Sequence, residues 1–390
     1  MKCRCLLNNK PTTKNLFLSF LRLGLTAFGG PAMVAHIREL STGRYQWLHE
    51  TDFKNGVALC QSIPGATAMQ TAAYVGLRVR GISGAFAAYL GFGLPAFILM
   101  LILSVIYERF SDLPRFISLF SGLQVIVVAI ILSSVYSFGR NIANNYRSLI
   151  IALLSAFVFW AGISPFIAIV GAGIAGMAIS RASVSKAAVD SDMRKTSTAK
   201  QVTLILICFL LCLAALYFLN NKLFALGAVM LKIDIFAFGG GFASLPLMLH
   251  EIVMGRGWLD SKTFMDGIAL GQVTPGPIVI TATFVGYLVY GLSGAIVATI
   301  AIFTPSFFML VIVAPFFDRL KNSVYFLRAI DGIFASFVGL LLYVCFKFAT
   351  TVPWDIARIL LGLAALAALI RKMDILYIVL AGAVISVFIL

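Results

Sequence analysis

The sequence repeats itself after about 210 residues. The first copy carries LTAFGGP at 25–31 and ALCQSIPGA at 58–66, and the second carries IFAFGGG at 235–241 and ALGQVTPGP at 269–277. A further matched pair begins with GISGAF at residue 81 and with GLSGAI at residue 291. The order of the pairs is the same in both halves, so a unit of about 180 residues is duplicated. In a membrane chain, such a duplication is typical of a transporter.

The composition is that of a membrane protein. Hydrophobic residues make up 61% of the chain and charged residues 12%, about half the charged share of soluble domains. The formal net charge of +15 would suggest nucleic-acid binding in a soluble protein. Here the Lys and Arg residues gather in short segments between apolar runs. This distribution indicates membrane topology, and we expect no nucleic-acid partner.

The six cysteines form neither a secreted disulfide framework nor a zinc-ligand spacing. Cys3 and Cys5 could hold a soft metal, but a plain basic tail is the simpler interpretation. We expect no metal and no cofactor. The first apolar run is broken at Gly29-Gly30-Pro31, so we expect no cleavable signal peptide and a first span that is retained.

Each copy contains six apolar segments that are candidate membrane spans. They lie near 16–35, 53–76, 82–107, 116–138, 148–163 and 165–180, and near 223–242, 264–287, 292–316, 325–349, 354–370 and 375–390. We expect a basic cytoplasmic tail (1–15), a first repeat (16–180), a cytoplasmic linker (181–200), one extra helix (201–219) and a second repeat (223–390). The predicted fold is an all-α polytopic membrane protein of about thirteen transmembrane helices.

The extra helix should invert the second repeat, because six crossings return the chain to its starting side. With a cytoplasmic N-terminus, most Lys and Arg residues outside the spans fall on the inner side, including five in the linker. If 53–76 and 264–287 were re-entrant hairpins, those five would move outside and this bias would disappear. We therefore favour thirteen crossings in the plasma (inner) membrane, with an extracytoplasmic C-terminus.

Both copies interrupt their apolar runs at matching places. AFGG ends the first segment, and Pro-Gly interrupts the second, as Pro64-Gly65 and as Pro275-Gly276-Pro277. Such breaks free backbone polar groups, which in a membrane need a protein or water-lined setting. Broken helices in inverted repeats commonly direct helix N-termini at an anion. A packing kink is the alternative, but recurrence in both halves favours a binding site.

Side chains able to hold oxygen atoms lie near these breaks. The uncharged donors are Gln61, Thr67, Gln70, Gln272, Thr274, Thr281 and Thr283. Arg22 and Lys232 lie within apolar segments, where a charge is costly. They either attract an oxyanion or extend to a nearby membrane interface.

Four further groups are candidates for coupling. Asp234 either carries a proton or forms a local pair, since residues two apart leave a helix in different directions. His36 and Glu39, with Glu251 in the second copy, are expected in loops after the first segment. They serve proton exchange or gating, or they are simply solvated.

The ordered motifs resemble the chromate ion transporter (CHR) family in its long-chain, two-domain form. The resemblance spans nearly the whole chain. It implies transport of chromate, with sulfate as a competitor, and cellular chromate resistance. The motif positions carried onto this sequence are Phe28, Gly29, Gly30, Pro31, Gln61, Pro64, Gly65 and Gln70, and Phe238, Gly239, Gly240, Pro275, Gly276 and Pro277. Ala66 stands where the family more often has a second proline.

We therefore predict export of a tetrahedral oxyanion by alternating access. Export suits a dianion, since one charge moving through 100 mV changes the free energy by about 2.3 kcal/mol. A sulfate or other oxyanion permease, or an anion channel, is the alternative. A membrane-embedded enzyme is disfavoured, because the chain lacks clustered carboxylates and His clusters with ligand spacing. The expected partners are the oxyanion and the lipid bilayer, and a homo-oligomer is compatible with this organisation.

Overall fold

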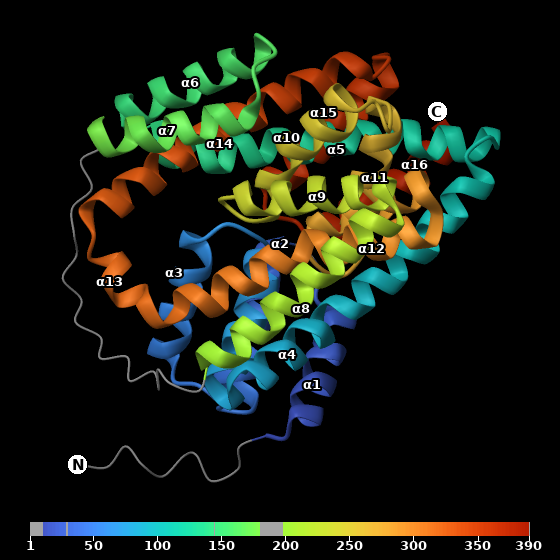
Figure 1. The fold of residues 1–390 in the computed structure, drawn as a ribbon. Helices are drawn as coiled ribbons and strands as arrows, with labels where there is room; N and C mark the ends of the chain where they lie inside the picture. The colour runs from blue at the N-terminus through green and yellow to red at the C-terminus, as the bar shows by residue number, and fades with distance from the viewer. Residues whose placement is uncertain (1–10, 29, 144, 180–197, 390) are drawn as a thin grey trace.

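The computed structural model describes residues 11–28, 30–143, 145–179 and 198–389 (Figure 1). Gly29, Cys3 and Cys5 lie outside the described residues, as do most of the predicted tail and linker. Every regular element of the described residues is helical, so the all-α prediction is confirmed. The first repeat contains α1 (Thr13–Thr26), α2 (Gly30–Arg38), the π-helical turn η1 (Glu39–Arg44), α3 (Glu50–Ser62), α4 (Thr67–Phe110), α5 (Pro114–Ala143), α6 (Tyr146–Trp160) and α7 (Pro165–Ile179).

The extra helix α8 (Thr198–Leu219) follows, and the second repeat has the corresponding helices in the same order, with additional short helical segments between them. It contains α9 (Asn221–Phe236), η2 (Gly241–Ala243), α10 (Ser244–Met248), the π-helical turn η3 (Leu249–Gly255), α11 (Ser261–Val273), η4 (Ile278–Ile280), α12 (Thr281–Val313), η5 (Ala314–Phe316), α13 (Phe317–Lys321), α14 (Val324–Thr351), α15 (Ile356–Ile370) and α16 (Ile375–Ile389).

The chain folds back on itself at each Pro-Gly break. Gly56 of α3 lies against the Tyr74 ring of α4, so closely that a Cβ at Gly56 would be 2.2 Å from it. In the second repeat, a Cβ at Gly267 would lie 2.4 Å from the Phe284 ring. Each break is thus the tip of a helical hairpin, because these contacts join residues about equally far before and after it. An arm of 13 residues is about 20 Å long, less than the hydrocarbon core of about 30 Å.

This result corrects the expectation that 53–76 and 264–287 each cross the membrane once, since their arms turn back at the break. Hydropathy cannot separate the two forms, because both arms are apolar and close in sequence. Four helices, α4, α5, α14 and the run from η4 to η5, are long and apolar enough to cross a membrane. The described part of the chain is therefore a polytopic membrane protein, but a total of thirteen crossings is not confirmed.

A second sharp turn lies within α4 and within α12. Gly81 has φ +68° and Gly291 has φ +61°, values that favour glycine. A close pair of glycines flanks each turn. A Cβ at Gly76 would lie 2.2 Å from the carbonyl oxygen of Gly84, and a Cβ at Gly286 would lie 2.3 Å from the carbonyl oxygen of Gly294. The long helices therefore bend back tightly after their first arms.

The two repeats interlock and form two bodies. One body contains α1–α4 and α8–α12, in which α4 packs against α12. In the other, α14 of the second repeat packs against α6 and α7 of the first, and α5 packs against α15 and α16. This second body is the upper part of the view in Figure 1. Each body therefore contains helices from both repeats.

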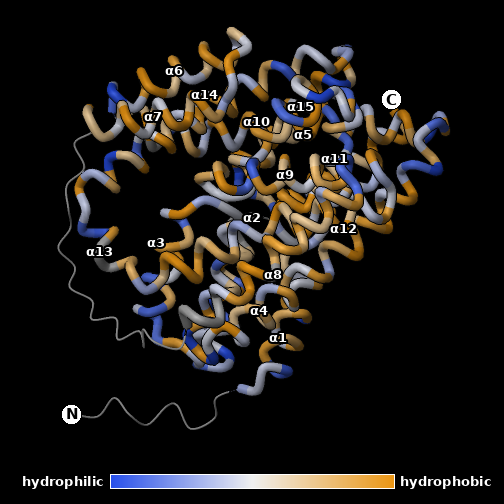
Figure 2. Tube along the Cα trace, viewed as in Figure 1, coloured by the Kyte–Doolittle hydropathy of each residue, from blue (hydrophilic) through white to orange (hydrophobic). Residues whose placement is uncertain are grey.

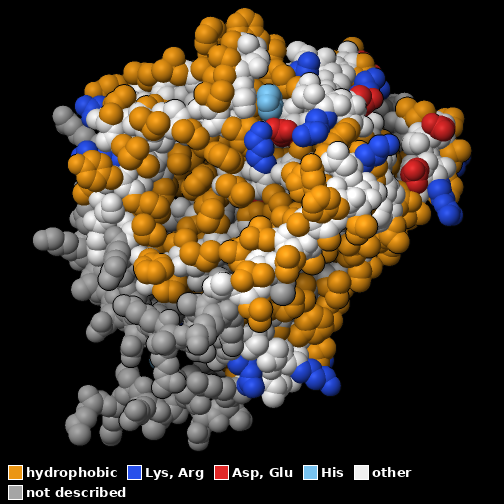
Figure 3. Space-filling view, in the orientation of Figure 1, with side chains coloured by type: hydrophobic (Ala, Val, Ile, Leu, Met, Phe, Trp, Pro, Cys, Tyr) orange, Lys and Arg blue, Asp and Glu red, His pale blue; other side chains and the backbone are white. Residues whose placement is uncertain are grey.

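The outer surface is largely apolar. Large hydrophobic side chains are exposed along α6, α7, α15 and α16, including Phe157, Ile167, Leu360 and Phe388. Figure 2 shows hydrophilic residues mainly near helix ends and connections, and Figure 3 shows charged side chains in small groups on a hydrophobic face. An apolar surface of this extent suits contact with lipid.

Candidate functional site

The Pro-Gly tip of the first repeat meets the AFGG break of the second repeat inside the first body. The backbone N–H of Gly65, at the Pro-Gly tip of the first repeat, donates to the carbonyl oxygen of Ala237 at 3.0 Å. Ala237 begins the AFGG break of the second repeat. The two recurrent motifs are therefore in direct contact, which their separation in the sequence does not reveal.

A buried polar network fixes this junction. Asp234 accepts hydrogen bonds from the backbone N–H of Ser306 at 2.7 Å and from the Ser306 hydroxyl, whose oxygen accepts from the Ala66 N–H at 3.0 Å. Gln70 donates to the carbonyl oxygens of Pro64 at 2.7 Å and Ser306 at 3.2 Å. Asp234 is only 1% exposed. The network satisfies both backbone and carboxylate groups that the breaks would otherwise leave unpaired.

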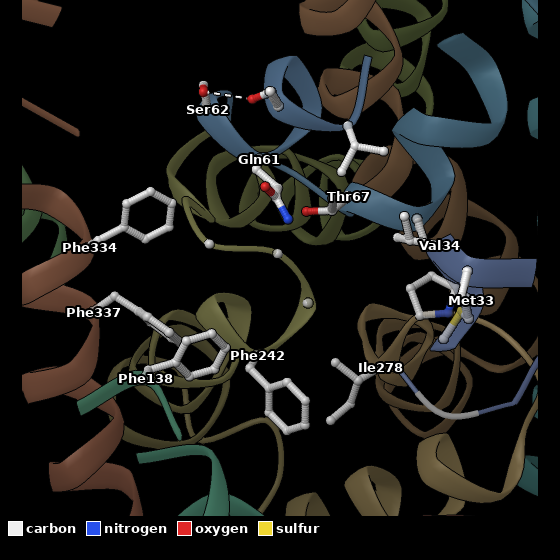
Figure 4. Close-up of a pocket in the computed structure, with 18 of the residues that line it drawn as sticks. Met33, Val34, Gln61, Ser62, Thr67, Phe138, Phe242, Ile278, Phe334 and Phe337 are labelled. Carbon is white, nitrogen blue, oxygen red and sulfur yellow. Dashed lines mark hydrogen bonds between the residues drawn. The ribbon is translucent and has the colours of Figure 1, made fainter. Parts of the chain in front are cut away.

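A cavity of about 1180 Å³ lies between the two bodies and ends at these tips (Figure 4). Gln61, Ser62 and Thr67 stand on one side of it, and Phe138, Phe334 and Phe337 stand on the other. Glycines 239–241 and 276, at the second-repeat breaks, also line it, as does Gly271 near the end of the helix Ser261–Val273. The cavity is therefore shared by both repeats and both bodies.

Backbone donors are concentrated at the inner end of the cavity. The N-terminal turn of α4 begins at Thr67 beside the cavity, and the first N–H groups of a helix have no intrahelical acceptor. Gly239 and Gly240 have φ values of +103° and +87°, and across the described chain no protein acceptor is recorded for their N–H groups. A Cβ at Gly240 would lie 3.2 Å from the Thr67 hydroxyl oxygen. Positive φ and close approach thus require glycine here.

Gln272 supplies a side-chain donor to the same region. It is 9% exposed and lines the cavity, and its Nε2 has no hydrogen-bond partner within the described residues. Gln61, its counterpart in the first repeat, lines the same cavity. A buried amide donor without a protein acceptor is costly unless a ligand or water satisfies it.

Charged side chains line the mouth of the cavity. Arg38 forms an ion pair with Glu50 at 2.6 Å, and Lys54 lies 3.6 Å from the same carboxylate. The hydrogen bond from Arg38 lowers the pKa of Glu50 from its ordinary value. Lys54 is 69% exposed, so the cavity opens to solvent at this end.

The mouth lies on the same side as the described N-terminal end of the chain. Asp52, two residues after Glu50, pairs with Arg78 at 3.3 Å, and Arg80 donates to the carbonyl oxygen of Pro11 at 3.0 Å. These contacts place the start of α3 and the turn within α4 beside residue 11.

The structure brings together only part of the predicted site. The residues that line the cavity are Gln61, Thr67, Gly239, Gly240, Gln272, Thr274, Gly276 and Pro277. Phe28, Pro64, Gly65, Gln70, Phe238, Pro275, Thr281 and Thr283 do not line it. Of these, Gly65 and Gln70 hold the tip through the contacts given above. Gly30 and Pro31 begin α2.

The two predicted intramembrane cations lie elsewhere. Arg22 is an exposed residue of α1. Lys232 pairs with Glu251 at 2.7 Å, and its ammonium lies 3.9 Å from the centre of the Phe166 ring. Neither lines the cavity, so the structure does not bring them to the hairpin tips.

The predicted coupling residues do not lie in loops. His36 belongs to α2, Glu39 to η1 and Glu251 to η3. New helical segments begin after the AFGG break in each repeat, where hydropathy alone predicts a loop. Asp234 forms no ion pair with Lys232 and is held by Ser306 instead.

Sequence reasoning missed several cavity residues and one buried acid. Arg38, Lys54 and Asp331 line the cavity, and Asp266 is buried in α11 at 5% exposure. Asp266 and Asp331 were detectable, because an acid within an apolar segment is a functional candidate by default. Across the part of the chain that the structure describes, no group of three or more His, Cys, Asp or Glu residues could hold a metal.

Comparison with known proteins agrees with the duplicated architecture. The chain matches the family described as Chromate transporter over residues 14–177 and 224–387. It is 44% identical over 384 residues to an uncharacterized transporter of Methanocaldococcus jannaschii, covering 98% of this chain and 96% of that protein. It is 31% identical over 372 residues to a chromate transport protein of Cupriavidus metallidurans, covering 92% and 88%. A chromate transport protein of Pseudomonas aeruginosa is 29% identical over 376 residues, covering 90% and 85%.

No solved structure matches the chain. The sequence matches confirm the predicted resemblance to the CHR family.

The buried network at the tips predicts a specific sensitivity at Ser306. Ser306→Ala removes the hydroxyl that joins Asp234 to the Ala66 N–H, leaving a buried donor unpaired at a cost of about 1–3 kcal/mol. We expect a lower thermal unfolding temperature in detergent. Thr304→Ala is the matched control, because this exposed hydroxyl on the same helix bonds only to the Ile300 carbonyl oxygen. Equal unfolding temperatures for the two variants would contradict the assigned role of Ser306.

Proposed function

This chain belongs to the chromate transporter family, and we propose that it carries chromate or a related tetrahedral oxyanion through the cavity between its two bodies. The observation that supports this function best is the unpartnered Gln272 amide, which lines the cavity beside the Pro-Gly break of the second repeat. It adds a side-chain donor to the free N–H groups of the breaks. A convergent set of neutral donors is the chemistry that recognises an oxyanion.

The proposed site binds the anion mainly through dipoles. Backbone N–H groups at Gly239, Gly240 and the start of α4, with the Gln61 and Gln272 amides, would replace the water around the oxyanion. The partial positive charge at the N-terminus of α4 adds attraction. Arg38 and Lys54 lie at the mouth, where exposed cations raise the local concentration of an anion.

We further propose that the net direction is export and that export confers chromate resistance. We take the N-terminus to be cytoplasmic, and with that orientation the cavity mouth, which lies beside residue 11, faces the cytoplasm. A dianion that leaves a negative interior gains about twice 2.3 kcal/mol per 100 mV. Export then needs no coupled ion, whereas uptake of the same anion would.

A carrier that works by alternating access is favoured over a channel by one observation. The cavity opens to solvent beside α3, whereas the counterpart helix α11 packs against α5 and α16. A pathway that is open at one end and closed at the other is expected of a carrier. Saturable exchange stimulated by anion on the far side would distinguish it from a pore.

Transport itself is tested by uptake of labelled chromate and labelled sulfate into everted vesicles, with and without an imposed potential. We expect saturable accumulation of chromate that rises when the vesicle interior is made positive and falls with excess sulfate. Vesicles from cells lacking the protein are the control. If properly inserted protein accumulates neither ion, the proposed substrate class is wrong.

The binding site predicts that Gly276→Leu abolishes transport. Gly276 has φ +125°, and a Cβ there would lie 2.7 Å from the Cβ of Ala96, so a large side chain would strain the tip and occupy the cavity. Gly162→Leu is the matched control, because Gly162 also has a positive φ but no atom within 4 Å of an added Cβ. Gln272→Ala should lower transport by about tenfold through loss of one donor to a charged ligand. Normal transport by Gly276→Leu at normal expression would rule out this site.

The proposed orientation predicts that the two chain ends lie on opposite sides of the membrane. A reporter that is active only in the cytoplasm should be active when fused to the N-terminus and inactive at the C-terminus, and a reporter active only outside should behave in the opposite way. Activity of the same reporter at both ends would refute an inverted second repeat.

A further inference from the structure

The two repeats are packed differently around the cavity, although their sequences correspond. Helix α3 of the first repeat borders the cavity along most of its length, whereas its counterpart α11 reaches the cavity only at its C-terminal end and is otherwise packed against α5 and α16. Three matched positions show the contrast. Gln61 is exposed and Gln272 is 9% exposed; Ala58 is exposed and Ala269 is 1% exposed; Lys54 is 69% exposed and Met265 is fully buried.

Specific contacts hold α11 in its packed position. The Asp266 carboxylate accepts hydrogen bonds from the Tyr107 hydroxyl of α4 and the Gln124 amide of α5, both at 2.8 Å. On the same helix, the Phe264 ring packs against the Phe348 ring of α14, with centroids 6.2 Å apart. Asp266 is 5% exposed, so these contacts shield the carboxylate from water.

The duplicated sequence identifies the corresponding residues on the open side. Asp266 corresponds to Asn55 of α3, and its partner Gln124 corresponds to Phe334 of α14. The pair Phe264 and Phe348 corresponds to Phe53 and Phe138. Phe53, Phe138 and Phe334 all line the cavity, and Figure 4 shows Phe138 and Phe334 on the wall opposite Gln61 of α3. The contacts that close one side thus have unused counterparts on the other.

We infer that α3 and α11 are the two gates of the transport pathway, and that Asp266 is the positioning residue that holds the α11 gate shut. In the second conformation, α3 packs against α5 and α14 as α11 packs now, bringing Phe53 to Phe138 and Asn55 to Phe334. α11 then leaves α5, and Gln272 becomes exposed while Gln61 becomes buried. This inference rests on the alternating access proposed above and names the residues that carry it out.

The chemistry of Asp266 suits a gate that must open. While α11 is packed, two neutral donors satisfy the carboxylate in a setting with little water. When α11 moves away, the carboxylate faces the new water-filled cavity, and hydration replaces both hydrogen bonds. The α3 gate has Asn55 and Phe334 at these positions, so it closes without an equivalent pair of hydrogen bonds. The conformation with α11 shut is therefore the one that Asp266 favours.

Paired cysteines test the two gates in the full-length protein in membranes, after replacement of the native cysteines. The pair Asn55→Cys with Phe334→Cys should crosslink only in the second conformation, and the pair Asp266→Cys with Gln124→Cys only in the present one. We expect oxidation to crosslink the first pair during turnover and to abolish transport by the same protein, with recovery after reduction. The inferred closure of α3 would be overturned if the Asp266→Cys/Gln124→Cys variant crosslinks but the Asn55→Cys/Phe334→Cys variant does not.

The role of Asp266 is tested separately by the labelling rate of Gln272→Cys with a water-soluble thiol reagent. Asp266→Ala should raise this rate by about tenfold through loss of two hydrogen bonds to a carboxylate, and Asp266→Asn should raise it less. Asn55→Ala, the matched change in the other gate, should leave it unchanged. An unchanged rate in Asp266→Ala would overturn the assigned role. The crosslinks and the labelling rate are both read on the protein itself, without a transport assay, so a wrong substrate and a wrong gate give different results.

Discussion

The fold depends on a constraint that water-soluble proteins do not share to this degree, namely that backbone groups freed by broken helices must be satisfied inside an apolar medium. Here they are satisfied across the duplication. The Gly65 N–H uses the Ala237 carbonyl oxygen, and the Ala66 N–H uses the Ser306 hydroxyl, which is itself held by Asp234. Since these partners belong to the second repeat, the tip of the first repeat is not complete within its own half, and the two repeats must interlock.

This dependence explains how much of the fold the sequence predicts. Pro and Gly residues and the duplication can be read directly from the sequence, so the breaks and the matched glutamines Gln61 and Gln272 are predictable. Both glutamines line the same cavity. Whether an apolar run crosses or turns back depends on a contact such as that of Gly56 with Tyr74. Such a contact leaves no periodic signal, because both arms of a hairpin are apolar.

The positions of the charged side chains differ from those expected from the sequence for a related reason. Lys232 is a conspicuous cation in an apolar run, but η3 folds back towards α9, so that Glu251 pairs with Lys232. Arg38 and Lys54 are unremarkable in the sequence and reach the cavity mouth only because α2 and α3 border it. The position of a charged residue along the chain determines the free-energy cost of inserting it into the membrane. The arrangement of the hairpins determines which residue it pairs with.

The duplication also carries information that a single repeat could not. Gln61 and Gln272 are the same residue type at matched positions of the two repeats. The difference in their burial therefore reflects the conformation of the protein and not the type of residue. Divergence then decides which conformation is favoured. Asp266 gives the packed α11 two hydrogen bonds, whereas Asn55 and Phe334 offer α3 no equivalent pair. A nearly symmetric molecule therefore acquires a preferred side through a few substitutions between its halves, without any change in its helical framework.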